Sequence, residues 1–121
     1  MAFANTPTER ELEILAILWE LGSASVREVF DLMRQRENIA QNTVQTFLRV
    51  MEEKGLVAHE TQGRAFIYRP LYTRQRVVGQ FVDRVFNGAV GDLVLQALQI
   101  KRLSAGEISA IEQMIQQARQ D

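Results

Sequence analysis

The chain of 121 residues contains no cysteine, one histidine and two prolines. Without cysteine it forms no disulfide, no thiolate metal site and no iron–sulfur cluster, and one histidine does not make a histidine metal site. The most apolar stretch, Leu12 to Trp19, is interrupted by Glu13 and is far shorter than a membrane span of roughly 20 residues. The sequence therefore indicates no metal, no cofactor and no membrane insertion, and it predicts a cytoplasmic protein.

An excess of one charge is also lacking, because 14 basic residues oppose 15 acidic ones. The distribution is uneven: residues 41–76 hold six basic and three acidic side chains, whereas residues 1–40 hold four and seven. Hydrophobic residues make up 46% of the chain and charged residues 24%, which is ordinary globular composition. A partner attracted by positive charge would therefore meet the middle of the chain.

The first half of the chain has the periodicity of three helices. We expect the first to start at Thr6-Pro7-Thr8-Glu9, with Thr6 as the cap and Glu9 completing a capping box, and to end at Gly22. The expected inward residues of this helix recur at three- and four-residue spacing: Leu12, Ile14, Leu15, Ala16, Leu18 and Trp19.

Two further helices follow. Ser25 and Glu28 form a capping box that opens a helix through about Gln35, and a third helix is expected from Gln41 to Lys54, ended by Gly55. Their expected inward residues are Val26, Val29, Phe30 and Met33 in the second helix and Val44, Phe47, Leu48 and Met51 in the third.

A hairpin is predicted after the third helix. Residues 56–61 and 65–68 have the character of strands, Gln62-Gly63 that of a turn, and Pro70 closes the second strand. Three helices followed by a hairpin is the order of a winged helix-turn-helix unit. The predicted fold is mainly α with a small β-hairpin, and residues 1–72 form the predicted winged-helix DNA-binding domain.

Residues 73–121 return to helical periodicity. A break is expected at Asn87-Gly88, and Ser104 with Glu107 forms a third capping box. These residues carry more large apolar side chains than three short helices can bury among themselves. We therefore predict a helical dimerisation region, with a homodimer formed through residues 73–119.

Polar residues line the outer face of the third helix. Amide side chains suit adenine edges, threonine suits a thymine methyl group or a phosphate, and arginine suits guanine or phosphate. Together with the expected hairpin tip, the candidate DNA-binding residues are Gln41, Asn42, Thr43, Gln45, Thr46, Arg49 and Arg64. An ordinary solvent-exposed helix face has the same composition. The interpretation as a DNA-binding face therefore depends on the two preceding helices and the hairpin that follows.

The remaining ionisable residues give little sign of catalysis. Lys54, Arg69, Arg74 and Arg76 extend the basic patch, although the last two are expected to be ordinary surface charges.

His59 is expected to be a surface or cross-strand residue, and the adjacent Glu52 and Glu53 do not form a catalytic pair because helix neighbours point about 100° apart. The sequence therefore predicts that the protein is not an enzyme.

The chain also resembles a known family. The segments that carry the resemblance are Thr8-Glu9-Arg10-Glu11-Leu12-Glu13-Ile14-Leu15, residues 43–57 (TVQTFLRVMEEKGLV), residues 63–70 (GRAFIYRP), Phe86-Asn87-Gly88 and Leu103-Ser104 before Glu107-Ile108. They are similar to the penicillinase-repressor (BlaI/MecI/CopY) family over nearly all of residues 6–119.

This resemblance implies a cytoplasmic homodimeric repressor that binds a dyad-symmetric double-stranded DNA operator. It places DNA contacts at Asn42, Thr43, Gln45 and Thr46 of the third helix and at Arg64 of the wing. It also implies a sensor protease as a partner. Antibiotic-responsive members are cut at an Asn-Phe bond where this chain has Gln96-Ala97, so the mode of release stays open.

Two other functions remain open at this point. One is a winged-helix module for protein–protein assembly, which the net acidity favours. The other is a ligand-gated regulator similar to MarR or PadR. The C-terminal segment argues against it, because its sequence offers no converging polar groups to orient a ligand.

Overall fold

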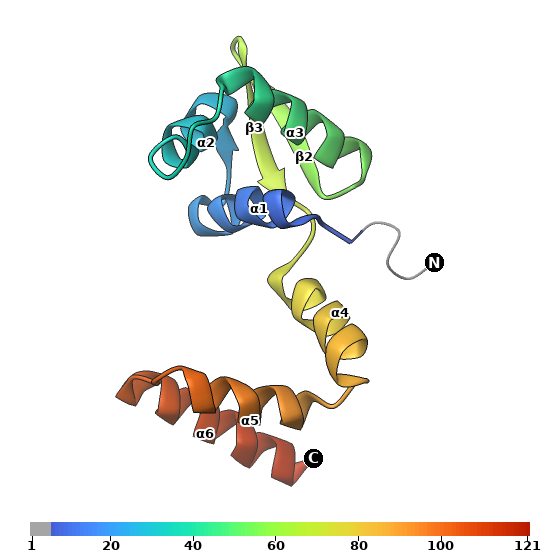
Figure 1. Cartoon of the computed structure of the whole chain (residues 1–121), viewed down its shortest axis with the longest axis vertical. Helices are drawn as coiled ribbons and strands as arrows, with labels where there is room; N and C mark the ends of the chain where they lie inside the picture. The colour runs from blue at the N-terminus through green and yellow to red at the C-terminus, as the bar shows by residue number, and fades with distance from the viewer. Residues whose placement is uncertain (1–5) are drawn as a thin grey trace. The chain divides into compact units, whose positions relative to one another are not determined.

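A computed structural model describes residues 6–121 of the chain. These residues divide into two compact units: the first extends to Gln80 and the second runs from Phe81 to Asp121 (Figure 1). The division falls inside helix α4 (Arg74–Phe86). The mainly helical class with a small sheet that the sequence predicts is confirmed.

The N-cap of helix α1 (Glu9–Leu21) lies two residues later than predicted. Thr8, not Thr6, is the N-cap: its hydroxyl accepts a hydrogen bond from the Glu11 N–H, and the Glu11 side chain accepts one from the Thr8 N–H. Thr8 and Glu11 have the same spacing as the predicted pair, so the sequence pattern fits both starts. The predicted end is confirmed, because Gly22 takes a positive φ of 83°.

Helices α2 (Val26–Met33) and α3 (Gln41–Glu53) confirm the next two predictions. Ser25 and Glu28 form the predicted capping box at the start of α2. Helix α3 has Ala40 at its N-cap and no side-chain cap, and Gly55, with a φ of 81°, follows its end. Since no side chain caps the start of α3, the stability of this helix rests on its buried face.

The sheet has three strands in the order β1-β3-β2, all antiparallel. The expected hairpin consists of β2 (Val57–Gln62) and β3 (Ala65–Pro70), while the two-residue strand β1 (Ala24–Ser25) is too short to have a sequence signature. The turn lies at Gly63-Arg64, one residue later than predicted, and Gly63 has a positive φ of 64°. In Figure 1 the hairpin runs beside α3 and its turn projects beyond the helices of this unit.

The core of the first unit lies between the three helices and the base of the sheet. Most of the predicted inward positions are buried, whereas Ala16 is exposed. Each large apolar side chain withdrawn from water contributes about 1.5–3 kcal/mol to stability. The buried cluster comprises Ile14, Leu15, Leu18, Ala24, Val29, Met33, Val44, Leu48, Met51, Leu56, Val57, Tyr68 and Tyr72.

The second unit contains the end of α4 and the helices α5 (Val90–Ile100) and α6 (Ala105–Gln120). The predicted break is confirmed by positive φ angles at Asn87 and Gly88. The predicted capping box is confirmed as well, with Ser104 as the N-cap of α6 and Glu107 as its partner.

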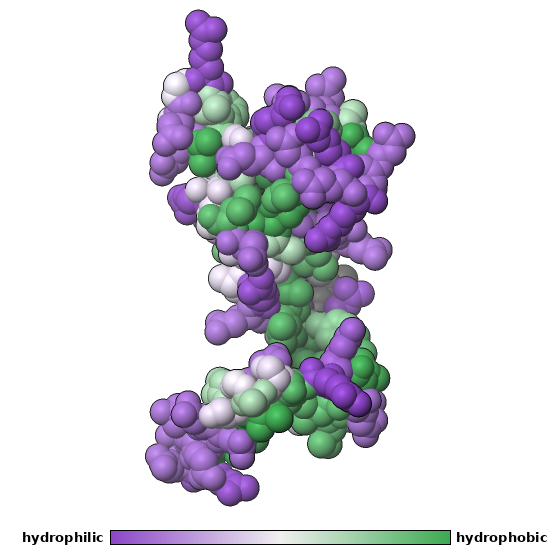
Figure 2. All heavy atoms as spheres, turned by 90° about the vertical axis from the view of Figure 1, so that its left-hand side faces the viewer, coloured by the Kyte–Doolittle hydropathy of each residue, from purple (hydrophilic) through white to green (hydrophobic). Residues whose placement is uncertain are grey.

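Apolar side chains remain at the surface of this unit. Neither α5 nor α6 has a buried residue, and Figure 2 shows apolar surface over these C-terminal helices. The exposed large apolar residues from residue 81 onward are Phe81, Val85, Val90, Val94, Leu95, Leu98, Ile100, Ile108, Met114 and Ile115. Among residues 6–121, no helix has the length and apolarity that crossing a bilayer requires.

Candidate nucleic-acid interface

Helix α3 separates a buried face from a polar face. Val44, Leu48 and Met51 are buried at three- and four-residue spacing, Phe47 packs against the same core, and the opposite side of the helix faces solvent. The exposed positions include all six candidate residues of the helix: Gln41, Asn42, Thr43, Gln45, Thr46 and Arg49.

An open groove joins this polar face to the hairpin, which we call the wing (β2 and β3, Val57–Pro70). One wall is α3, the other is the wing, and the start of α2 also contributes to the lining. The groove brings together six of the seven candidate residues, namely Gln41, Asn42, Gln45, Thr46, Arg49 and Arg64. Its other lining residues are Ser25, Val26, Arg27, Glu52, His59, Ala65, Phe66 and Tyr68.

Thr43 lies outside this groove. It lines a second hollow between α1 and α3, together with Thr8, Phe47 and Val50. Asn42 and Thr46 border both hollows, so they lie on the ridge between them. The face that the sequence predicts is therefore wider than the groove alone.

The candidate side chains of α3 are only weakly held by the protein. The Thr46 hydroxyl donates a hydrogen bond of 3.0 Å to the Asn42 carbonyl, which leaves its lone pairs free to accept. Arg49 lies 3.8 Å from the Glu53 carboxylate, and both side chains are about two-thirds exposed. Exposed pairs of this kind contribute little, so a phosphate or base can compete for the guanidinium.

Arg64 is available at the tip of the wing. Gly63 supplies the positive φ that the two-residue turn needs, which places Arg64 at the second turn position. Within residues 6–121, Arg64 makes no hydrogen bond or ion pair. Its charge is therefore free to meet a phosphate.

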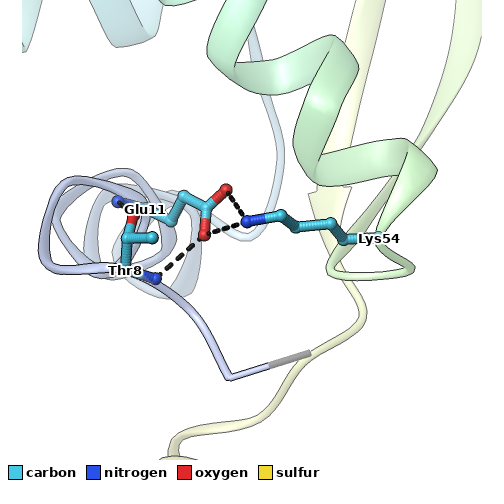
Figure 3. Close-up of polar contacts among 3 residues, drawn as sticks. All are labelled: Thr8, Glu11 and Lys54. Atoms are coloured by element: carbon cyan, nitrogen blue, oxygen red, sulfur yellow. Dashed lines mark hydrogen bonds and ion pairs between the residues drawn. The ribbon is translucent and has the colours of Figure 1, made fainter. Parts of the chain in front are cut away.

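Three of the other cations of the expected basic patch contact side chains of the protein, whereas Arg69 is an exposed residue of β3 opposite Ala58. Lys54 forms an ion pair with Glu11, with its Nζ 3.0 Å and 2.9 Å from the two carboxylate oxygens (Figure 3). The guanidinium of Arg74 lies 5.1 Å from the centre of the Trp19 ring, and that of Arg76 lies 4.4 Å from the centre of the Tyr72 ring. Lys54 thus differs from the sequence-based expectation, because it stabilises the fold.

Glu11 is buried, with 2% of its surface exposed, yet it is held ionised. Burial by itself raises the pKa of this carboxyl, but the hydrogen bond from the Thr8 N–H and the adjacent Lys54 ammonium outweigh it, so the pKa lies below its usual value. The pair therefore joins the start of α1 to the end of α3.

A polar and aromatic cluster connects α3 to the wing inside the groove. His59 faces Tyr68 across the β2–β3 ladder, which confirms it as a cross-strand residue. Its Nδ1 lies 2.7 Å and 2.8 Å from the Glu52 carboxylate oxygens, and its backbone N–H donates to the same carboxylate at 3.2 Å. The His59 ring stacks on Phe66, with ring centres 4.1 Å apart.

Tyr68 is buried next to this cluster, and its surroundings shift the pKa of its hydroxyl. Burial and the nearby Glu52 carboxylate raise the pKa of the Tyr68 hydroxyl, against a smaller opposite effect of Arg49. No local sequence pattern brings Glu52, His59, Phe66 and Tyr68 together. The alternation of the two strands puts His59, Phe66 and Tyr68 on one face, but only the hairpin register brings them to Glu52.

The groove offers amides, hydroxyls and three arginines to a ligand. Such groups bind base edges and phosphates and do not form a nucleophile with an activating base. Within residues 6–121, no three His, Asp or Glu side chains are grouped so that they could hold a metal ion. The geometry therefore favours binding of an anionic, hydrogen-bonding polymer over catalysis.

Comparisons with known proteins agree with this geometry. The sequence profile of the penicillinase repressor family matches residues 7–117. The penicillinase repressor of Bacillus licheniformis is 27% identical over 114 residues, which cover 91% of this chain and 89% of that protein. The methicillin resistance regulatory protein MecI of Staphylococcus aureus is 21% identical over 109 residues, covering 87% and 89%.

A solved structure is similar to the first part of the chain. The solution structure of the DNA-binding domain of the repressor BlaI matches with a TM-score of 0.54 and 26% identity, covering 60% of this chain and 88% of that domain. The prediction of a winged helix-turn-helix fold is thereby confirmed.

Proposed function

The chain belongs to the penicillinase repressor family and is a DNA-binding transcriptional repressor, and we propose that it binds a dyad-symmetric operator as a homodimer. In this proposal the outer face of α3 enters the major groove, while Arg64 of the wing contacts the backbone. Occupying the operator blocks access to the promoter.

The groove between α3 and the wing is the observation that supports this assignment of residues. Gln45 and Arg49 lie one turn apart on the exposed side of α3, a spacing that suits neighbouring base pairs. Arg64 reaches the same groove from the wing without a partner in the described chain. Base contacts from the helix then give specificity, and the wing adds a salt-dependent contribution.

The exposed apolar surface of the C-terminal helices supports a homodimer through residues 73–119. Val94 and Leu98 on α5, and Ile108 and Ile115 on α6, are 40–48% exposed. Each helix thus keeps two apolar residues about one or two turns apart in water, which costs free energy unless a partner covers them. A second copy of the chain offers the same apolar surface and also supplies the second recognition helix that a dyad-symmetric operator needs.

The proposed function has consequences for catalysis, location and partners. A repressor needs no catalytic group, so we propose that the chain is not an enzyme. Because its proposed target is DNA, we propose that it acts in the cytoplasm. A sensor protease is proposed as the partner that relieves repression, by cutting the chain at a bond other than Gln96-Ala97.

Selection from a random duplex pool tests the function. Purified full-length protein is expected to enrich a palindrome whose half-site centres lie about 10 base pairs, or a multiple of that, apart. Footprints at two salt concentrations then show which contacts depend on phosphates. Failure of a dimeric protein to enrich any sequence would instead favour the protein-assembly module, and enrichment only in the presence of a small molecule would favour a ligand-gated regulator.

A further inference from the structure

The wing touches α3 at its base but projects freely beyond His59. Residues 60–66 are all exposed, and no hydrogen bond or ion pair joins them to α3 within the described part of the chain. Arg64 lies at the end of this free segment. Its position relative to α3 therefore depends on how firmly the hairpin is held at His59.

Glu52 holds the hairpin at that point with three short contacts. Its carboxylate accepts from the His59 backbone N–H and lies within hydrogen-bond distance of Nδ1 through both oxygens. The side chains are only 33% and 28% exposed, so water competes less than it would for a surface pair. The ring of Phe66 stacks on that of His59 and links this contact to β3.

Glu52 is an acidic residue in a groove that we propose binds DNA, so its presence there needs a structural reason. A carboxylate in a groove that binds DNA repels phosphates, so by itself it lowers affinity. Its presence there is accounted for if it fixes the geometry of the groove. The strut consisting of Glu52 and His59 has that effect, because it joins the helix that reads bases to the hairpin that carries Arg64.

We propose that Glu52 and His59 are positioning residues that hold the wing against α3, so that the helix and Arg64 engage the operator at a fixed spacing. This inference rests on the proposed function. Neither residue needs to touch DNA: the strut acts through Arg64 and through the face of α3. Binding to an operator should require it, whereas binding to random DNA, which tolerates many wing positions, should not.

The test measures how much Arg64 contributes when the strut is intact and when it is cut. Full-length wild type, Glu52→Ala and His59→Phe are each compared with and without Arg64→Ala, on the selected operator and on a random duplex of equal length. His59→Phe preserves an aromatic ring for the stack on Phe66 and removes only the Nδ1 contact. Glu60→Ala is the matched control, because Glu60 is an exposed acid on the opposite face of the same strand.

We expect the effect of Arg64→Ala on operator affinity to be about tenfold smaller in both strut variants than in wild type or Glu60→Ala. We also expect Glu52→Ala to lower the ratio of operator to random affinity. Glu52→Gln, which keeps an acceptor oxygen, should restore much of that ratio. Melting curves ensure that each protein is measured while folded, and His59→Phe decides the matter if Glu52→Ala does not fold.

Two results would overturn the inference while leaving the proposed function intact. One is an Arg64→Ala effect that is equal in all backgrounds. The other is a Glu52→Ala variant that binds both duplexes more tightly by the same factor, which would mean that Glu52 acts only through its charge. Absence of any operator preference in the wild type would instead refute the proposed function, and the inference with it.

Discussion

Glu11 and Lys54 form an ion pair that joins the first turn of α1 to the residue after α3, with Nζ 2.9 Å from the nearer carboxylate oxygen. The same carboxylate closes the capping box of α1 through Thr8. One buried side chain thus fixes the start of the first helix and the end of the helix that carries the candidate DNA contacts. The pair adds a polar link between α1 and α3 to the apolar packing of Val44, Leu48 and Met51.

Lys54→Met should lower stability without changing the salt dependence of DNA binding. The substitution leaves the Glu11 carboxylate buried without its ammonium partner, at a cost of about 1–3 kcal/mol, below that of a fully buried pair because Lys54 is one-third exposed. Chemical denaturation measures the loss, and Lys101→Met, at an exposed site, is the control. A shallower salt slope with unchanged stability would mean that Lys54 contacts phosphate after all.

Acid should weaken the protein through Glu11. The pKa of this carboxyl is lowered in the folded state, so its ionised form stabilises the fold above about pH 4.5 and that contribution is lost as the pH falls through the folded value. Glu11→Gln removes the titration. The stability difference between wild type and Glu11→Gln should therefore be largest near neutrality and shrink in acid. A difference that is constant with pH would contradict the assignment.

Gln45→Ala should reduce operator affinity by about 1–3 kcal/mol and leave binding to random duplex nearly unchanged, because a base contact is lost and no charge is removed. Gln35→Ala, at an exposed site beyond the end of α2, is the matched control. Quantitative gel-shift titrations on both duplexes give the two affinities. Equal losses on both would show that Gln45 does not read sequence.

The sequence predicts most of the fold because local signals agree with the packing. The capping boxes at Ser25 and Ser104 and the glycine after each of the first and third helices lie where residue chemistry places them. The wrongly predicted N-cap of α1 comes from a sequence pattern that fits two positions equally well. Thr6 and Thr8 offer the same capping spacing, and the second is the cap whose partner, Glu11, also contacts Lys54.

The candidate site could be predicted only in part. The polar face of α3 follows from helix periodicity, and the groove contains all its candidates except Thr43. The partner of Lys54 lies 43 residues away in the chain, so no local pattern separates it from a free cation such as Arg64. The link from Glu52 to His59 likewise depends on how α3 and the hairpin meet, which is a property of the tertiary structure.

Ile115→Glu should disrupt the proposed dimer. Ile115 is 48% exposed on α6, and a carboxylate there would be buried without a partner when a second chain covers the helix. We expect a monomer at micromolar concentration and operator affinity lowered by about 10²–10⁴, because the two half-sites would no longer be bound together. Sedimentation gives the mass, and Gln117→Glu on the same helix is the control. A dimer that is unaffected by Ile115→Glu would show that the interface does not include this face of α6.

Arg64→Ala should weaken binding to operator and random duplex alike. A guanidinium at the tip of a wing meets the phosphate backbone, and each phosphate contact contributes about 0.9 to the slope of log affinity against log salt. The slope should therefore become shallower by about 1, and the loss of affinity should be largest at low salt. Arg36→Ala, at an exposed position between α2 and α3, tests whether any lost positive charge has this effect. If the two variants shift the slope equally, long-range attraction accounts for the result, whereas a shift confined to Arg64→Ala places the wing tip on the backbone.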